Sequence, residues 1–257
     1  MGVFLYEKGL TVQVVYIPGF GEDLGEYSKV FCAKTSKKYH MAALTLNYFC
    51  IGSRGTTGAG VEVFNSERDK VKSAYVELGG EGEASLEKLS ELLVKYDAEI
   101  ILKGAFIPTK NEYQNFGILA AIDIVNAIKD AIKRFDLNDE NIILVGASYG
   151  SYLANLVTKI YPGLVRAVFD NSSWALPNLK YAVGTELGLP EGIHKAYPGI
   201  TLHLNVKSPW TLKPGLPNSF NGDRLEIRAF TQNQLSQMLN QGGQDTFYFF
   251  IMPNMMM

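Results

Sequence analysis

Apolar residues follow two alternating patterns along the chain, short continuous runs and stripes at helical spacing. The continuous runs are bounded by Gly, Pro or polar residues and are rich in β-branched and aromatic side chains, as buried strands are. They are TVQVVYI (11–17), HMAALTLNYF (40–49), NIILVG (141–146), LVRAVFDNSS (164–173) and TFYFFIMPN (246–254). Runs of this kind predict strands of a parallel sheet that is covered on both faces.

The stripes predict helices between these strands. They consist of Leu24, Tyr27, Val30 and Phe31; of Leu86, Leu89, Leu92 and Leu93; and of Ile118, Ile122, Val125 and Ile132. A further helix is predicted after residue 150 and ends at Pro162 and Gly163. Strand, helix, strand order is the order of right-handed crossovers, so we expect an α/β fold: a mostly parallel central sheet with helices on both faces.

The chain length favours a single domain over residues 1–257, because α/β domains of this size usually remain undivided. Six prolines interrupt residues 174–244, where the apolar periodicity becomes patchy. We therefore expect this stretch to be a cap or lid with short helices, inserted after the fourth predicted strand.

Candidate chemistry lies where the third predicted strand meets its helix. Residues 146–150 read GASYG, the Gly-x-Ser-x-Gly pattern of a nucleophile elbow, which would lift the Ser148 hydroxyl clear of the sheet. The new helix would aim its first N–H groups at the same place, so the backbone N–H of Tyr149 is one candidate oxyanion donor. The Gly-Phe-Gly loop after the first strand supplies Phe20 as the second. A plain glycine-rich turn is the alternative.

The ordered motifs IPGFG, LNYFCIGSR, QNFGILAAIDIVNAI, GASYGSYLANL and FDNSSW resemble those of the α/β-hydrolase superfamily. More closely, they resemble a little-characterised bacterial family of serine-hydrolase-like proteins. The resemblance covers roughly residues 10–177. It implies Ser148 as nucleophile, Phe20 and Tyr149 as oxyanion donors, and a small-molecule ester, thioester or amide as substrate.

An acid and a histidine should complete such a site. Asp170 ends the strand after the elbow and is the candidate acid, although Asp-Asn-Ser-Ser could equally cap the following segment. Asp245 precedes its strand and points to the wrong sheet edge. His40 also precedes its strand, whereas His194 and His203 lie in the predicted cap; the neighbouring glycine makes His194 the candidate base.

The ends of the chain depart from the hydrolase pattern. In α/β hydrolases the acid usually follows the second strand after the elbow and the histidine follows the third, but here the sequence ends at that second strand. Little precedes the first predicted strand. The closing MPNMMM suggests the hypothesis of an early stop or shifted frame, which sequencing beyond the codon for Met257 would test. A truncated, non-catalytic hydrolase-like protein is therefore the alternative function.

Composition excludes several other classes of function. The 24 basic and 26 acidic residues give a formal net charge of −2 without a like-charged block, which favours neither nucleic acid nor a membrane as partner. Cys32 and Cys50 form no disulfide framework or metal motif, and no basic leader begins the chain, so we expect a cytoplasmic protein. In GFGEDLG (19–25), Leu24 stands where the dinucleotide motif Gly-x-Gly-x-x-Gly needs its last glycine, so no dinucleotide cofactor is predicted. No metal is predicted either. An exposed last strand would allow a homodimer.

Overall fold

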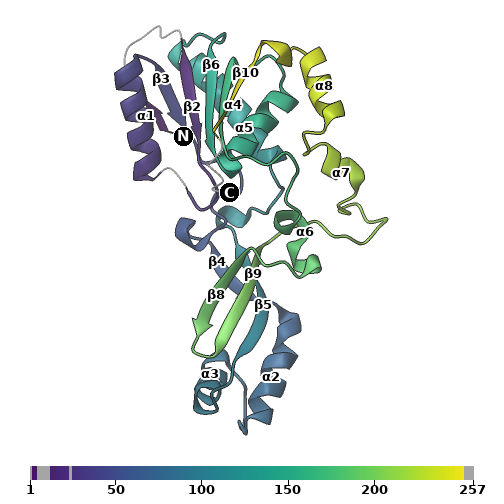
Figure 1. The fold of residues 1–257 in the computed structure, drawn as a ribbon. Coiled ribbons are helices and arrows are strands. Elements are labelled where there is room, and N and C mark those ends of the chain that lie inside the picture. Colours follow the sequence, from purple (N-terminus) through teal and green to yellow (C-terminus); the bar gives the residue numbers. More distant parts are fainter. Residues whose placement is uncertain (1, 5–11, 23–24, 252–257) are drawn as a thin grey trace, which may run out of the picture. The chain divides into compact units, whose positions relative to one another are not determined.

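The computed structural model describes residues 2–4, 12–22 and 25–251, which form two compact units (Figure 1). Unit 1 comprises residues 1–52, 115–178 and 220–257, and unit 2 comprises residues 53–114 and 179–219. Two features of the sequence lie outside the described residues: Leu24 of the first predicted helix, and the MPNMMM ending.

Unit 1 is built on a six-stranded sheet in the order β1-β3-β2-β6-β7-β10. The strands are β1 (Gly2–Phe4), β2 (Gln13–Ile17), β3 (Ala42–Thr45), β6 (Ile142–Ala147), β7 (Ala167–Asn171) and β10 (Phe247–Ile251). Strand β1 pairs antiparallel with β3, and all other neighbours pair in parallel. The five predicted strands are thus confirmed, and the one that precedes Ser148, β6, lies inside the sheet between β2 and β7.

Helices cover both faces of this sheet (Figure 1). Helix α1 (Glu26–Tyr39) packs on the face that carries Tyr16, Ala43 and Val145. Helix α5 (Tyr149–Ile160) lies against Gly146, whose neighbour Val145 points to the α1 face, so α5 covers the opposite face. Helix α4 (Ile118–Phe135) packs against α5. The predicted α/β class, with a mostly parallel sheet between helices, is confirmed.

The buried faces of two predicted helices differ from the stripes read in the sequence. In α1, Tyr27 and Val30 are 69% and 43% exposed, and the small residue Cys32 is buried instead. Small side chains let α1 approach the sheet residue Tyr16 closely. In α4, Ile122 is 41% exposed, whereas Ile124 is fully buried. So many residues of α4 are apolar that the periodicity allows more than one buried face.

Unit 2 has a separate four-stranded sheet in the order β4-β5-β9-β8. Its strands are β4 (Gly60–Val63), β5 (Ile100–Ile107), β8 (Gly192–Tyr197) and β9 (Ile200–Val206). Helices α2 (Arg68–Glu77) and α3 (Leu86–Lys95) contribute Tyr75 and Leu89 to its core, which also contains Leu102, Leu202 and Leu204. The helix predicted from Leu86, Leu89, Leu92 and Leu93 is thereby confirmed as α3, and a side-chain cap at Ser85 begins it.

Residues 174–244 are divided between the two units. They contain the expected short helices α6 (Lys180–Leu187), α7 (Gly222–Glu226) and α8 (Gln232–Asn240), together with strands β8 and β9, which the sequence did not predict. Single 3₁₀ turns complete the described elements: η1 (Gly55–Thr57), η2 (Asn65–Glu67), η3 (Thr109–Asn111) and η4 (Gly243–Asp245).

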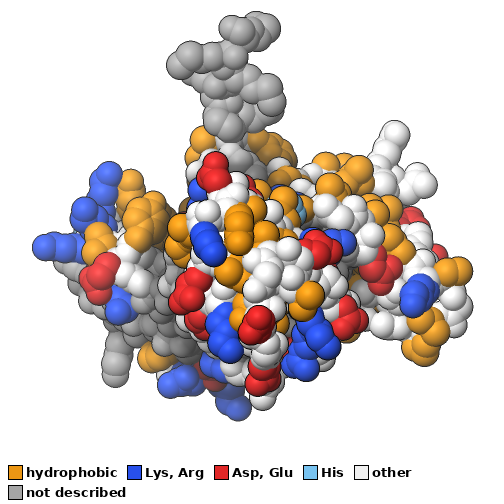
Figure 2. Space-filling view, turned by 90° about the horizontal axis from the view of Figure 1, so that it is seen from below, with side chains coloured by type: hydrophobic (Ala, Val, Ile, Leu, Met, Phe, Trp, Pro, Cys, Tyr) orange, Lys and Arg blue, Asp and Glu red, His pale blue; other side chains and the backbone are white. Residues whose placement is uncertain are grey.

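The surface mixes charged and apolar side chains. On the face drawn in Figure 2, basic and acidic side chains stand beside one another with hydrophobic side chains between them. Across the residues that the structure describes, no helix has both the length and the hydropathy required to span a bilayer.

Candidate functional site

Ser148 occupies the turn that joins β6 to α5. Its backbone has φ 53° and ψ −116°, a positive-φ conformation that is strained for a residue with a side chain. The Ser148 side chain is exposed, although the strand before it and the helix after it are largely buried. The Ser148 N–H donates to the Asn171 carbonyl at 2.8 Å, which ties the turn to the end of the neighbouring strand β7.

The two glycines of GASYG are required by packing. A Cβ atom on Gly146 would lie 2.4 Å from the Ser151 nitrogen, and one on Gly150 would lie 2.0 Å from the Ile17 carbonyl oxygen. Both obstacles are backbone atoms that cannot move aside cheaply. The glycines therefore let α5 approach β6 and β2 closely enough to hold Ser148 at the tip of the turn.

The Gly-Phe-Gly loop lies beside this turn. A Cβ atom on Gly19 would be 3.7 Å from the Ser148 Cβ, so the backbone of the loop passes directly next to the serine. The Phe20 ring stacks on the Tyr149 ring with centroids 3.8 Å apart. The Tyr48 hydroxyl donates to the Pro18 carbonyl at 2.9 Å and supports the loop from below the surface.

Burial sets the protonation of the tyrosines around the serine. Burial raises the pKa values of Tyr48 and Tyr149 well above the ordinary tyrosine value. Both phenols therefore stay neutral at any pH at which the protein would be assayed. Neither can act as a base toward Ser148, and their aromatic rings provide an apolar wall.

A polar stripe on α5 anchors the ends of β7 and β10. The Asn171 N–H donates to the Ser151 hydroxyl at 2.9 Å, and the Tyr248 hydroxyl donates to the Thr158 hydroxyl at 3.0 Å. Asn155 lies between these two residues on the helix and donates to Asp170. This stripe was not predicted from the sequence. Its signal was three polar residues, at i, i+4 and i+7, in an otherwise apolar helix.

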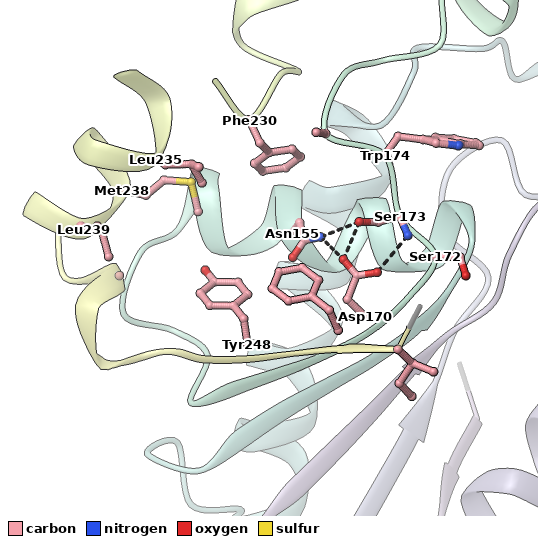
Figure 3. A pocket seen from close by; sticks show the side chains of 14 residues that line it. Asn155, Asp170, Ser172, Ser173, Trp174, Phe230, Leu235, Met238, Leu239 and Tyr248 are labelled. Atoms are coloured by element: carbon pink, nitrogen blue, oxygen red, sulfur yellow. Dashed lines mark hydrogen bonds between the residues drawn. The ribbon is translucent and has the colours of Figure 1, made fainter. Parts of the chain in front are cut away.

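Asp170 lies at the carboxyl end of β7 and is only 1% exposed. Its carboxylate accepts the Asn155 amide N–H at 2.6 Å, the Ser173 N–H at 2.9 Å and the Ser173 hydroxyl (Figure 3). Asp170 thus joins α5 to the segment after β7 and caps that segment. The structure brings Asp170 next to β6, the strand that precedes Ser148, with Gly146 directly opposite in register.

The three histidines are divided between the two units. His40 ends α1 and precedes β3, so it is at the amino end of the sheet, whereas Ser148 follows the carboxyl end of β6. His194 is an exposed residue of β8 opposite Leu202, and His203 is on β9 opposite Ile193; both belong to unit 2. Asp245 closes η4, before β10 begins.

In the described part of the chain, no three His, Cys, Asp or Glu residues lie close enough together to hold a metal ion. Cys32 and Cys50 are both buried. Burial raises the pKa of the Cys32 thiol to about 12, so this cysteine is unreactive as well as inaccessible.

Unit 1 thus has an α/β fold with an exposed, strained serine between a buried strand and a buried helix, beside a glycine-rich loop. The chain belongs to the family described as Protein of unknown function (DUF2920), which matches residues 4–254. Among curated proteins, no match is found.

Solved structures similar to the chain include three enzymes. An esterase from the archaeon Pyrobaculum calidifontis is 12% identical, with a TM-score of 0.36 over 67% of this chain and 39% of its own length. An acylaminoacyl peptidase from Pyrococcus horikoshii is 10% identical, with a TM-score of 0.43 over 97% of this chain and 34% of its own. Est1E from Butyrivibrio proteoclasticus, solved with ferulic acid, is 11% identical, with a TM-score of 0.39 over 98% of this chain and 84% of its own length.

Proposed function

We propose that the chain is a serine hydrolase of the esterase type, with Ser148 as the nucleophile at a Gly-x-Ser-x-Gly elbow. The carrying observation is the Ser148 backbone, at φ 53° and ψ −116°, with the side chain exposed. Such a conformation costs of the order of 1–3 kcal/mol in a non-glycine residue, and a plain strand-to-helix turn does not need it. Strain that presents a hydroxyl to solvent is what a nucleophile elbow provides.

The oxyanion of the acyl intermediate would be held by two backbone N–H groups. Tyr149 is the first residue of α5, and the N–H groups of a first helical turn lack intrahelical acceptors and lie at the positive end of the helix dipole. Phe20 is the second donor in this proposal. Its support is the closeness of Gly19 to Ser148 and the stacking of the Phe20 ring on Tyr149. Removing one such donor typically slows catalysis 10²–10³-fold.

Activation of Ser148 would need an acid and a base. Asp170 is the proposed acid, but its carboxylate already accepts hydrogen bonds from Asn155 and Ser173. His194 is the proposed base, and His203 is the second histidine of the same unit. A serine without a base retains only the part of catalysis that comes from the oxyanion donors and from binding, so we expect slow turnover if neither histidine serves.

Labelling with a fluorophosphonate probe tests the nucleophile directly. The full chain is incubated with the probe, alongside a known serine esterase and the Ser148→Ala variant. We expect a label on Ser148 in the unchanged protein and none in the variant. Absence of label on the unchanged chain, under conditions that label the control esterase, would reject the proposal. The pH profiles of His194→Gln and His203→Gln identify the base, because loss of a base removes the rise in rate with pH.

A second candidate function is a non-catalytic, ligand-binding relative of the hydrolases. It is favoured by one observation: His40, the histidine of unit 1, lies at the opposite end of the sheet from Ser148. Hydrolysis of simple acyl esters that is lost in Ser148→Ala would reject this second function. A protein that binds esters without turning them over would support it.

A further inference from the structure

Unit 1 contains a cavity of about 960 Å³ beside the carboxyl ends of β7 and β10. Its wall is mostly apolar and includes Trp174, Phe230, Leu235, Met238, Tyr248 and Phe250. Side chains of α8 stand on one side of the cavity and Trp174 on the other (Figure 3). This volume lies at the upper end of the range for small-molecule pockets, so a ligand with a long apolar part would fit.

The polar part of the cavity wall is centred on three residues. Asn155, Asp170 and Ser173 are hydrogen-bonded to one another (Figure 3). Ser172 and Tyr248, which carry hydroxyl groups, also line the cavity. The carboxylate of Asp170 would repel a second carboxylate, and no Lys or Arg is among the described residues that line the cavity. The chemistry of the wall therefore favours a neutral apolar chain over a free fatty acid.

The cavity wall is connected to Ser148 through β7. Asp170 and Ser172 line the cavity, and Asn171 between them accepts the Ser148 N–H at 2.8 Å. The Trp174 ring, on the other wall, lies 6.2 Å from the Tyr149 ring, the residue after Ser148. A ligand chain in the cavity would therefore have one end near the serine.

From these contacts we propose that the cavity binds the apolar acyl chain of a neutral ester. This inference rests on the proposed function, since it names the acyl part of the substrate that Ser148 would attack. Each methylene that enters the cavity should strengthen binding about threefold to fourfold, until the chain reaches the far wall. Leu235, on α8, is 45% exposed, so a charge can be placed there on the cavity wall without disturbing the buried core.

Binding is measured apart from turnover with the variant Ser148→Ala/Trp210→Phe. The chain has two tryptophans, so Trp174 is then the sole tryptophan, and its emission is excited selectively at a wavelength that tyrosine does not absorb. Methyl hexanoate, methyl octanoate and methyl decanoate are titrated, with decanoate anion for comparison. We expect a change in Trp174 emission, tighter binding with each longer ester, and weaker binding of the anion than of its methyl ester. Equal affinity for all three esters, or no change in emission, would overturn the inference.

Two further variants locate the binding. Leu235→Glu places a carboxylate in the cavity wall and should weaken methyl decanoate binding at least tenfold. Leu176→Glu makes the same change at a residue that is 57% exposed and does not line the cavity, and should leave binding unchanged. Equal losses in both variants would overturn the inference.

The outcomes separate this inference from the proposed function. Tighter binding of longer esters to a protein that the fluorophosphonate does not label supports the cavity and rejects the hydrolase. Ser148-dependent hydrolysis of methyl acetate supports the hydrolase. If kcat/KM then stays constant from acetate to decanoate and is unaffected by Leu235→Glu, the cavity inference is overturned.

Discussion

The backbone conformation of Ser148 is the main evidence for a nucleophile at this position. A φ of 53° with a ψ of −116° is accessible to glycine at little cost, but a Cβ atom makes it unfavourable. The hydrogen bond to Asn171 and the packing of α5 on β6 hold the residue there. The fold therefore maintains a strained residue whose side chain contributes little to packing, because it is exposed.

Replacing Ser148 by glycine should stabilise the protein. Relief of the strain, less the extra chain entropy that glycine loses on folding, should raise the free energy of unfolding by about 1 kcal/mol. Ser148→Ala is the matched control, since alanine keeps the Cβ atom and the strain. Urea unfolding of the three proteins measures the difference, and a glycine variant that is less stable than the alanine variant would show that the turn is unstrained.

Gly150 should tolerate no side chain. A Cβ atom there would meet the Ile17 carbonyl oxygen at 2.0 Å, which would push α5 away from β2. We expect Gly150→Ala to lower the free energy of unfolding by about 1–3 kcal/mol or more, the usual cost of overpacking. Gly222→Ala is the control, because nothing lies near its Cβ position. A Gly150→Ala protein as stable as this control would contradict the close approach.

The sequence predicted the serine, its glycines and the neighbouring Gly-Phe-Gly loop because local pattern determines them. Turn residues, small residues and a strand-to-helix transition are all visible within a few positions. The Ser173 partner of Asp170 lies only three residues away and is the cap that Asp-Asn-Ser-Ser suggested. The Asn155 partner was not predictable in the same way, since Asn155 reaches Asp170 only when α5 packs on β7, and one sequence does not specify such a tertiary contact.

At the scale of elements, α5 and β7 are joined by a buried polar cluster. Asp170→Asn should destabilise the protein by about 1–3 kcal/mol, because an amide in place of one carboxylate oxygen faces the donors of Asn155 and Ser173. The double variant Asn155→Asp/Asp170→Asn restores a donor and an acceptor and should recover part of the loss. Thermal unfolding measures both.

The same variant distinguishes a structural role of Asp170 from a chemical one. If Asp170→Asn leaves stability unchanged but abolishes fluorophosphonate labelling of Ser148, the carboxylate acts on the reaction rather than on the packing of α5. Recovery of stability in the double variant without recovery of labelling would have the same meaning.

Lys159 links α5 to the segment after α7 and should make stability depend on pH. Its ammonium donates to the carbonyls of Glu226 and Ala229, and burial lowers its pKa from the ordinary 10.5 to about 8. Between these two pH values the unfolded chain binds the proton that the folded chain has released. The contribution of Lys159 to stability is therefore lost as the pH falls through about 8 and is regained toward 10.5.

Lys159→Met tests this pH dependence. The difference in free energy of unfolding between the unchanged protein and the variant should shift in favour of the unchanged protein from about pH 7.5 to about pH 9.5. Taking the difference cancels the pH dependence of the titratable groups that both proteins share. One of these is Cys32, whose raised pKa makes stability fall as the pH rises, the opposite of the effect of Lys159. A difference that stays constant over this range would show that the pKa of Lys159 is not lowered in the folded protein.

For helices, the sequence predicted existence better than orientation. Helix α4 was expected to present Ile122 to the core, but Ile122 is exposed, and Ala121 and Ile124 are fully buried instead. Apolar residues on α4 occur on more than one side, so the pattern alone leaves the buried face open. Which face is buried depends on the neighbour, and α5 reaches α4 only in the folded chain.

At the scale of the whole molecule, the chain enters unit 2 twice, through residues 53–114 and 179–219. Strands β5 and β9 pair in parallel although about a hundred residues separate them, as with Leu102 opposite Leu202. This sheet was not predicted from the sequence. A pairing of such long range leaves no local signal, and the prolines of residues 174–244 interrupt the apolar pattern around β8 and β9.

Each unit has its own core and one tryptophan, Trp174 in unit 1 and Trp210 in unit 2. Separate cores allow separate cooperative transitions, so we expect a core mutation to act mainly on its own unit. Leu202→Ala in unit 2 and Leu153→Ala in unit 1 remove side chains that are 2% and 0% exposed. Each should destabilise its unit by about 2–5 kcal/mol.

Single-tryptophan proteins report the two units separately during urea unfolding. With Trp174→Phe, Trp210 follows unit 2; with Trp210→Phe, Trp174 follows unit 1. We expect Leu202→Ala to lower the urea midpoint seen by Trp210 more than that seen by Trp174, and Leu153→Ala to do the reverse, because each cavity weakens the core in which it lies. Equal shifts at both tryptophans for both mutations would mean that the two cores unfold as one cooperative structure, in spite of their separate sheets.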